Sequence, residues 1–329
     1  MILVGDCIAS MRALPEKSVQ TCVTSPPYFG LRDYGHEGQI GLEPTPDEFV
    51  GKLVEVFREV RRVLADDGTL WLNLGDSYAA QRGGTHQPAE TLAGGRGGKT
   101  EDGERVNRDR FDGYNPTRNA TAIGLKHKDL IGIPWRVAFA LQADGWYLRQ
   151  DIIWHKPNPM PESVRDRCTK AHEYIFLLSK SERYYFDADA IRQPAAESTR
   201  GKTWDERKAM GFRGDTKHPT KDAIEAGLHI PSFAPNPNGV NRRSVWTVTT
   251  KPYKGAHFAT FPPDLIEPCI LAGSRVGDVV LDPFGGAGTT GLVSQRHGRQ
   301  FVLCELNPDY ARMAEDRIAA ERDLLSEAV

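Results

Sequence analysis

The sequence predicts an α/β protein built on a doubly wound, mostly parallel β-sheet. Short apolar segments with strand character alternate with helical patterns at both ends of the 329-residue chain, and this alternation is typical of a parallel sheet covered by helices. The second observation is a glycine-rich turn at 285–288, which lies between a short apolar strand and a helical segment. A chain of this length buries a substantial core and accommodates insertions between its elements.

The elements of the first half follow from their local patterns. Apolar residues recur at helical spacing through 46–64, with Thr45 as the N-cap and Pro46 at the first helical position. Asp66-Asp67-Gly68 is typical of a turn. The elements expected around them are strands at 2–4, 19–25, 69–74, 146–154 and 173–178, and helices at 8–14, 46–64 and 134–143.

The second half repeats the alternation after two irregular stretches. A helix is expected from Pro262, strands at 279–281 and 300–304, a helix from Thr289 and a last helix capped by Asn307. Residues 77–127 are rich in Gly, Arg, Asp and Asn and predict a mobile insert, and the polar stretch 190–250 is broken by Pro and Gly. We therefore expect two catalytic-domain segments, 1–189 and 251–329, with a separate region at 190–250.

Composition excludes several classes of protein. No apolar run approaches the ~20 residues of a membrane helix, and the five cysteines include no Cys-x-x-Cys pair, so neither a disulfide framework nor a metal site is expected. A reducing cytoplasm fits this pattern. The net charge of −2 gives no overall nucleic-acid signature. Residues 192–254, however, hold 12 Lys and Arg against 6 Asp and Glu, a local excess that favours a basic surface.

The run Thr24-Ser25-Pro26-Pro27-Tyr28 is the first of two motifs that carry chemistry. A Pro-Pro step cannot continue a strand, because proline lacks the N–H donor and fixes φ, so the chain leaves the sheet there as a stiff loop. The loop offers a hydroxyl, a carbonyl that no helix uses and an aromatic ring. Together these groups suit a flat molecule with an –NH2 group, which needs two acceptors and a stacking surface.

The second motif is Asp282-Pro283-Phe284-Gly285-Gly286-Ala287-Gly288-Thr289-Thr290. Its glycines allow a ligand to approach the backbone and the start of the next helix. The loop lacks the Gly-Lys-Ser/Thr ending of a phosphate loop, and its leading carboxylate disfavours a pyrophosphate but suits a cationic amine. Glu305 ends the next strand, where an acid commonly binds ribose. A nucleoside that carries an amino acid and no phosphate satisfies both features, which predicts S-adenosylmethionine.

The two motifs resemble those of DNA amino-methyltransferases, and their order resembles the circularly permuted β group, over roughly residues 1–75, 130–180 and 255–320. The resemblance implies a Rossmann-like methyltransferase fold, double-stranded DNA as substrate and a target-recognition role for 190–250. Homodimers and a cognate restriction nuclease are further expectations from similar enzymes. The implied cofactor-binding residues are Asp6, Cys7, His257, Phe258, Thr260, Asp282, Phe284, Gly285, Gly286, Gly288, Thr289 and Glu305, and the implied base-pocket residues are Trp154, His155 and Lys156.

The predicted catalytic residues are Ser25, Pro26, Pro27 and Tyr28. The Ser25 hydroxyl and the Pro26 carbonyl would accept the two amine hydrogens, and Tyr28 would stack on a base flipped out of the duplex. A serine at the first loop position favours cytosine N4 in similar enzymes, with adenine N6 as the alternative. An RNA or small-molecule amine substrate, and a non-catalytic binding protein, are less favoured alternatives. Pro268-Cys269 resembles the Pro-Cys of carbon-5 cytosine enzymes, but it lies in an apolar helical stretch, so Cys269 is interpreted as a packed core cysteine.

Overall fold

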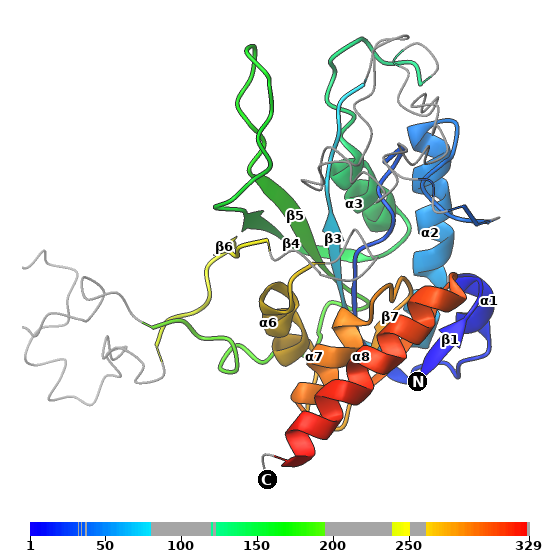
Figure 1. Cartoon of the computed structure of the whole chain (residues 1–329), viewed down its shortest axis with the longest axis vertical. Coiled ribbons are helices and arrows are strands. Elements are labelled where there is room, and N and C mark those ends of the chain that lie inside the picture. Colours follow the sequence, from blue (N-terminus) through cyan, green and yellow to red (C-terminus); the bar gives the residue numbers. More distant parts are fainter. Residues whose placement is uncertain are drawn as a thin grey trace, which may run out of the picture. The chain divides into compact units, whose positions relative to one another are not determined.

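The computed structural model describes residues 1–31, 33, 35–36, 38–79, 120, 123–194, 239–250 and 261–327. Two compact units are distinguished: Met1–Phe186 together with Ser244–Val329, and Asp187–Arg243. The whole β-sheet belongs to the first unit (Figure 1). Within the described ranges, no helix combines the length and the apolar character needed to cross a membrane.

The sheet is formed by strands from both ends of the chain. The strands are β1 (Ile2–Val4), β2 (Val19–Thr24), β3 (Leu64–Leu74), β4 (Tyr147–His155), β5 (His172–Ser179), β6 (Val245–Thr247), β7 (Val279–Asp282) and β8 (Gln300–Glu305). The helices are α1 (Cys7–Arg12), α2 (Pro46–Val63), α3 (Ile133–Ala143), α6 (Pro263–Gly273), α7 (Thr289–Arg296) and α8 (Pro308–Glu327).

The strand order is β1-β8-β7-β2-β3-β5-β4-β6, and only the pairings of β5 are antiparallel (Figure 1). The doubly wound, mostly parallel sheet predicted from the sequence is confirmed. Because the other strands run in one direction, their carboxyl ends meet at a single edge, which we name the carboxyl edge. The amino end of β5 lies at the same edge. Ligands of such open α/β sheets bind at that edge.

Helix α2 illustrates how the sequence builds this fold. Its buried positions recur at helical spacing and pack against the sheet, and the Thr45 hydroxyl accepts a hydrogen bond from the Glu48 amide at 3.2 Å. The predicted N-cap is therefore confirmed. Helix α3 is capped by a residue distant in the chain. Asp76, just after β3, accepts hydrogen bonds from the amides of Gly132 and Ile133 at the start of α3.

The turn predicted at Asp66-Asp67-Gly68 is wrong, because these residues lie within β3. The pairing with β2 shifts there: Val19 pairs with Leu64, but Thr21 pairs with Thr69. The residues between form an irregularity in the strand, which bends the ladder without ending it. The turn-forming residues thus produce a bulge, and the strand resumes its regular pairing at Thr69.

Strand β6 was not predicted from the sequence. It is three residues long and follows a polar segment, so it has no periodicity to detect, yet it pairs with β4 along Ile153–His155 and buries Trp246. The predicted recognition region 190–250 therefore contains one strand of the main sheet. Cys269 in α6 is 1% exposed, which confirms its interpretation as a core residue.

Candidate active site

Two predicted motifs and Glu305 lie at adjacent positions along the carboxyl edge. β7 pairs with β2 on one side and with β8 on the other, so the Ser-Pro-Pro-Tyr loop after β2, the glycine loop after β7 and Glu305 at the end of β8 follow one another. A hydrogen bond joins the two motifs, from Thr24 to Asp282, although these residues are 258 positions apart in the chain. The parallel sheet brings them together.

The loop after β2 presents polar acceptors on a fixed backbone. Ser25 is half-buried, and within the described part of the chain its hydroxyl makes no hydrogen bond, nor does the Pro26 carbonyl accept one. Phe29 anchors the loop, since its ring is 2% exposed and lies 5.5 Å from the ring of Phe49 in α2. The loop therefore holds two acceptors in a defined place, and no described residue uses them.

Asp282 ties the two loops together. Its Oδ1 accepts hydrogen bonds from Thr24 Oγ1 at 2.6 Å and from the Phe284 amide at 3.0 Å, and its Oδ2 accepts one from Thr290 Oγ1 at 2.7 Å. The residue is 2% exposed, and burial raises the pKa of its carboxyl group to about 6 although these hydrogen bonds act in the opposite direction. Both oxygens are used within the protein, so an attraction to a cationic ligand would act through space.

Glu305 holds the glycine loop from the neighbouring strand. Its Oε2 accepts a hydrogen bond from the Gly286 amide at 2.8 Å and its Oε1 accepts one from the Asn307 amide at 2.9 Å. Burial raises the pKa of this carboxyl group. Each carboxylate oxygen retains a further lone pair, so Glu305 has the capacity to accept further hydrogen bonds from hydroxyl groups. The carboxylates and the glycine-loop backbone at this edge fit S-adenosylmethionine, which carries ribose hydroxyls and a cationic amine.

Gly288 is required both by its backbone conformation and by its neighbours. Its φ is +76°, and a Cβ at this position would lie 2.8 Å from the Cβ of Ala314 in α8. We expect Gly288→Ala to lower the free energy of unfolding by about 2–4 kcal/mol, from positive-φ strain together with overpacking. Chemical denaturation measures the change.

Gly124 provides the matched control for this substitution. Its φ is +70°, but no described residue lies within 4 Å of a Cβ added there, so Gly124→Ala carries the backbone strain without the collision. Its expected cost is about 1–2 kcal/mol. Equal costs at the two positions would contradict the packing role of Gly288.

Other predicted cofactor residues have clear structural contacts. Asp6 caps α1 by accepting a hydrogen bond from the Ala9 amide at 2.8 Å. Cys7 is 8% exposed, and burial raises the pKa of its thiol to about 12. Thr289 is buried, and its hydroxyl accepts a hydrogen bond from Arg317 in α8 at 3.0 Å. Phe284 is half-buried against the core, whereas His257, Phe258 and Thr260 lie outside the described residues.

The predicted base-pocket residues lie at the carboxyl end of β4. Trp154 is 4% exposed and donates a hydrogen bond to the Val248 carbonyl at 2.8 Å, so it acts mainly as core. His155 is half-exposed beside the Thr247 hydroxyl. Lys156 forms an ion pair with Glu173 at the start of β5.

Glu173 and Asn73 contact a predicted site residue, Tyr28, and the sequence interpretation missed them. Both contact the Tyr28 hydroxyl: Tyr28 Oη donates to Glu173 Oε2 at 2.7 Å and lies 3.4 Å from Asn73 Oδ1. The only sequence signal was a pair of opposite charges, Lys156 just after one predicted strand and Glu173 at the start of the next.

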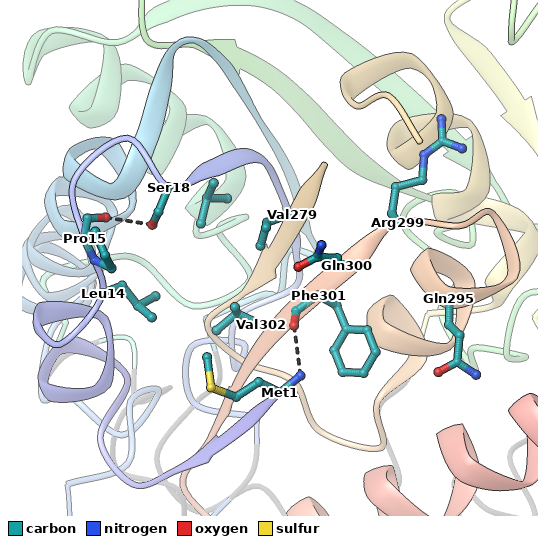
Figure 2. Close-up of a pocket in the computed structure, with 11 residues that line it drawn as sticks. Met1, Leu14, Pro15, Ser18, Val279, Gln295, Arg299, Gln300, Phe301 and Val302 are labelled. Carbon is teal, nitrogen blue, oxygen red and sulfur yellow. Dashed lines mark hydrogen bonds between the residues drawn. The ribbon is translucent and has the colours of Figure 1, made fainter. Parts of the chain in front are cut away.

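A cavity of about 470 Å³ lies at the opposite edge of the sheet, where β2, β7 and β8 begin (Figure 2). Its lining includes Met1, Ser18, Val279 and Phe301, and none of the predicted site residues. The Ser18 hydroxyl donates to the Pro15 carbonyl at 2.7 Å and so has a partner within the chain (Figure 2). This cavity is separate from the site at the carboxyl edge.

Comparison with known proteins gives consistent matches along the chain. A family described as DNA methylase, of the N6/N4 type, matches residues 19–316. The Type II methyltransferase M.Cfr9I of Citrobacter freundii is 47% identical over 317 residues, which cover 96% of this chain and 87% of that protein. M.SmaI of Serratia marcescens is 46% identical and is matched over 98% of this chain and 91% of its own length.

Solved structures agree with the sequence matches. A DNA modification methylase of Thermus thermophilus, TTHA0409, solved in complex with S-adenosyl-L-methionine, is 26% identical with a TM-score of 0.55, over 97% of this chain and 93% of that one. The cytosine-N4-specific PvuII DNA methyltransferase is 18% identical with a TM-score of 0.58, over 98% and 91% of the two chains. At that identity, the second match is a match of fold.

Proposed function

The chain belongs to the N6/N4 DNA methylase family, and from this premise we propose that it methylates the N4 amine of cytosine within a specific sequence of double-stranded DNA. The enzyme is an S-adenosylmethionine-dependent DNA methyltransferase. S-adenosylmethionine supplies an electrophilic methyl group when it is bound. Glu305, the glycine loop and the Gly5-Asp6 turn are the residues we propose to hold it.

The contact between Thr24 and Asp282 is the main support for placing the target amine at Ser25 and the cofactor at the glycine loop. Thr24 immediately precedes Ser25, and Asp282 opens the glycine loop, so the 2.6 Å hydrogen bond between them fixes the spacing of the two loops. A target amine held at Ser25 would then lie beside a cofactor held by the glycine loop. Such fixed alignment supplies a large part of the rate of a two-substrate reaction.

The residues of the proline loop act on the amine. Ser25 Oγ and the Pro26 carbonyl oxygen accept its two hydrogens, which draws the nitrogen toward tetrahedral geometry and makes its lone pair available. Tyr28 stacks on the base, which must leave the duplex at a cost of roughly a few kcal/mol. Ser25 acts as a hydrogen-bond acceptor, and the proton is lost to water once the nitrogen is methylated.

Cytosine N4 is the favoured amine because Ser25 occupies the first loop position, as in the cytosine-N4 group that the sequence resembles. Adenine N6 is the alternative, since both amines present two hydrogens to the same acceptors. We expect N4-methyl-2′-deoxycytidine when DNA modified by the enzyme is digested to nucleosides and their masses are measured. N6-methyl-2′-deoxyadenosine in its place would reject the cytosine assignment and leave the methyltransferase assignment intact.

The partners of the enzyme follow from its relatives and its charge. Relatives with this level of identity are named Type II methyltransferases, which supports a cognate restriction nuclease as a partner. The excess of Lys and Arg in 192–254 supports contact between this region and the DNA backbone, where affinity is mainly electrostatic. A homodimer stays a prediction from similar enzymes.

A further inference from the structure

A network of polar side chains surrounds the hydroxyl of Tyr28. Glu173 Oε2 accepts hydrogen bonds from Tyr28 Oη at 2.7 Å and from Asn73 Nδ2 at 3.3 Å, and Glu173 Oε1 pairs with the ammonium of Lys156. We propose that Glu173 is a positioning residue that fixes the Tyr28 ring as the stacking surface for the flipped base. This inference rests on the proposed role of Tyr28 in base capture.

The network is built on rigid strands. Glu173 pairs with Trp154 across β4 and β5, and Asn73 pairs with Ile175, two residues along β5 from Glu173. Because side chains alternate between the faces of a strand, Asn73 and Glu173 project to the same face. Three neighbouring strands therefore set the position of the carboxylate, and sites built on strands are held more accurately than sites built on loops.

Lys156 balances the charge of this carboxylate. Its ammonium lies 4.2 Å from the centroid of the Trp154 ring while it pairs with Glu173, and the two charged side chains are 18% and 15% exposed. A carboxylate this far from water is costly without a cation. Lys156 is thus held by Glu173 and the Trp154 ring, and these contacts suit a supporting role better than direct contact with DNA phosphate.

A second restraint acts on the ring of Tyr28. A Cβ added at Gly75 would lie 2.4 Å from Tyr28 Cε2, so the ring lies directly against the backbone after β3. The hydroxyl is bonded at one end and the ring is packed along its side. A ring fixed in this way has little rotational freedom left to lose when a base stacks on it, which favours capture.

A double-mutant cycle tests whether Glu173 acts through the Tyr28 hydroxyl. The variants are Tyr28→Phe, Glu173→Gln and the two combined, assayed on a duplex that contains the site found by methylation-sensitive sequencing. We expect each single variant to lower kcat/KM for DNA about 10-fold, the loss typical of one hydrogen bond to a charged group. The double variant should lose no more than about threefold beyond Glu173→Gln, because both changes abolish the same charge-assisted hydrogen bond.

Cofactor binding and a nearby ion pair provide the controls. The Kd for S-adenosylmethionine, measured by calorimetry without DNA, should match the wild type in all three variants. Glu162→Gln removes a different ion pair, with Arg167, in the same connection between β4 and β5, and should keep the wild-type kcat/KM.

Additive losses in the cycle would overturn the inference, as would a wild-type kcat/KM for Tyr28→Phe. Should Glu173→Gln fail to fold, Tyr28→Phe still tests whether the hydroxyl contact matters, because it deletes one oxygen and leaves Glu173 paired with Lys156. Neither result would reject the role proposed for Ser25, which is tested by its own substitution. Absence of methyl transfer to DNA by the wild type would instead reject the proposed function.

Discussion

Replacing Ser25 by alanine is expected to lower kcat for methyl transfer about 100-fold while the Kd for S-adenosylmethionine stays unchanged. The hydroxyl is half-buried at the carboxyl edge and makes no hydrogen bond among the described residues, so its removal leaves none of their polar groups unpaired. What is lost is an acceptor for the target amine as its nitrogen becomes tetrahedral. Removing one prearranged hydrogen-bonding group from a transition state costs about 10²–10³ in kcat.

The measurement is single-turnover transfer of labelled methyl groups to duplex DNA, with cofactor affinity measured separately. Ser18→Ala is the matched control: it removes a hydroxyl just before β2, at the opposite edge of the sheet, where Ser18 donates to the Pro15 carbonyl. That variant should transfer methyl groups at the wild-type rate. A Ser25→Ala enzyme within threefold of the wild type would remove Ser25 from the mechanism.

The fold was predictable because its elements carry strong local signals. α2 has a complete apolar stripe, an N-cap and a proline at its first position, and the strands around the two loops are short apolar runs bounded by turn residues. The Asp66–Gly68 bulge and β6 were missed for the opposite reason. A bulge depends on pairing with β2, and a three-residue strand depends on pairing with β4, so neither is encoded locally.

The candidate site also combines residues that the sequence predicted with residues that it did not. Ser25, the glycine loop and Glu305 belong to contiguous motifs, and the matches to DNA methylases confirm the family and the cofactor that these motifs predicted. Their individual roles stay predictions. Glu173 and Asn73 belong to no motif; they meet Tyr28 only because β3 and β5 pair in antiparallel register. Long-range pairing of this kind is invisible to a single sequence read for periodicity.

Asp282→Ala is expected to have a large effect on stability, lowering the free energy of unfolding by about 3 kcal/mol. The side chain accepts hydrogen bonds from Thr24, Thr290 and the Phe284 amide, and both threonines are at most 1% exposed. Each buried donor left unpaired costs about 1–3 kcal/mol. Relief from the burial of a charged group offsets part of this loss. Denaturant unfolding at pH 7 measures the difference, with Thr45→Ala as a comparison variant that loses only solvent-exposed hydrogen bonds with Glu48 at the start of α2.

Asp282→Asn separates the charge from the hydrogen bonds. Burial raises the native pKa to about 6 from an ordinary value of 3.8, despite the opposing hydrogen bonds from Thr24, Thr290 and the Phe284 amide. Between about pH 4 and pH 6 the folded state therefore retains a proton that the unfolded chain has released. The contribution of this group to stability falls as the pH rises through that window and is constant above it. Asparagine does not titrate, so the unfolding free energy of wild type minus Asp282→Asn should decline from pH 4 to pH 6. A difference that is flat or that rises across this range would show that the carboxylate is ionised in the native state throughout, and that its hydrogen bonds outweigh its burial.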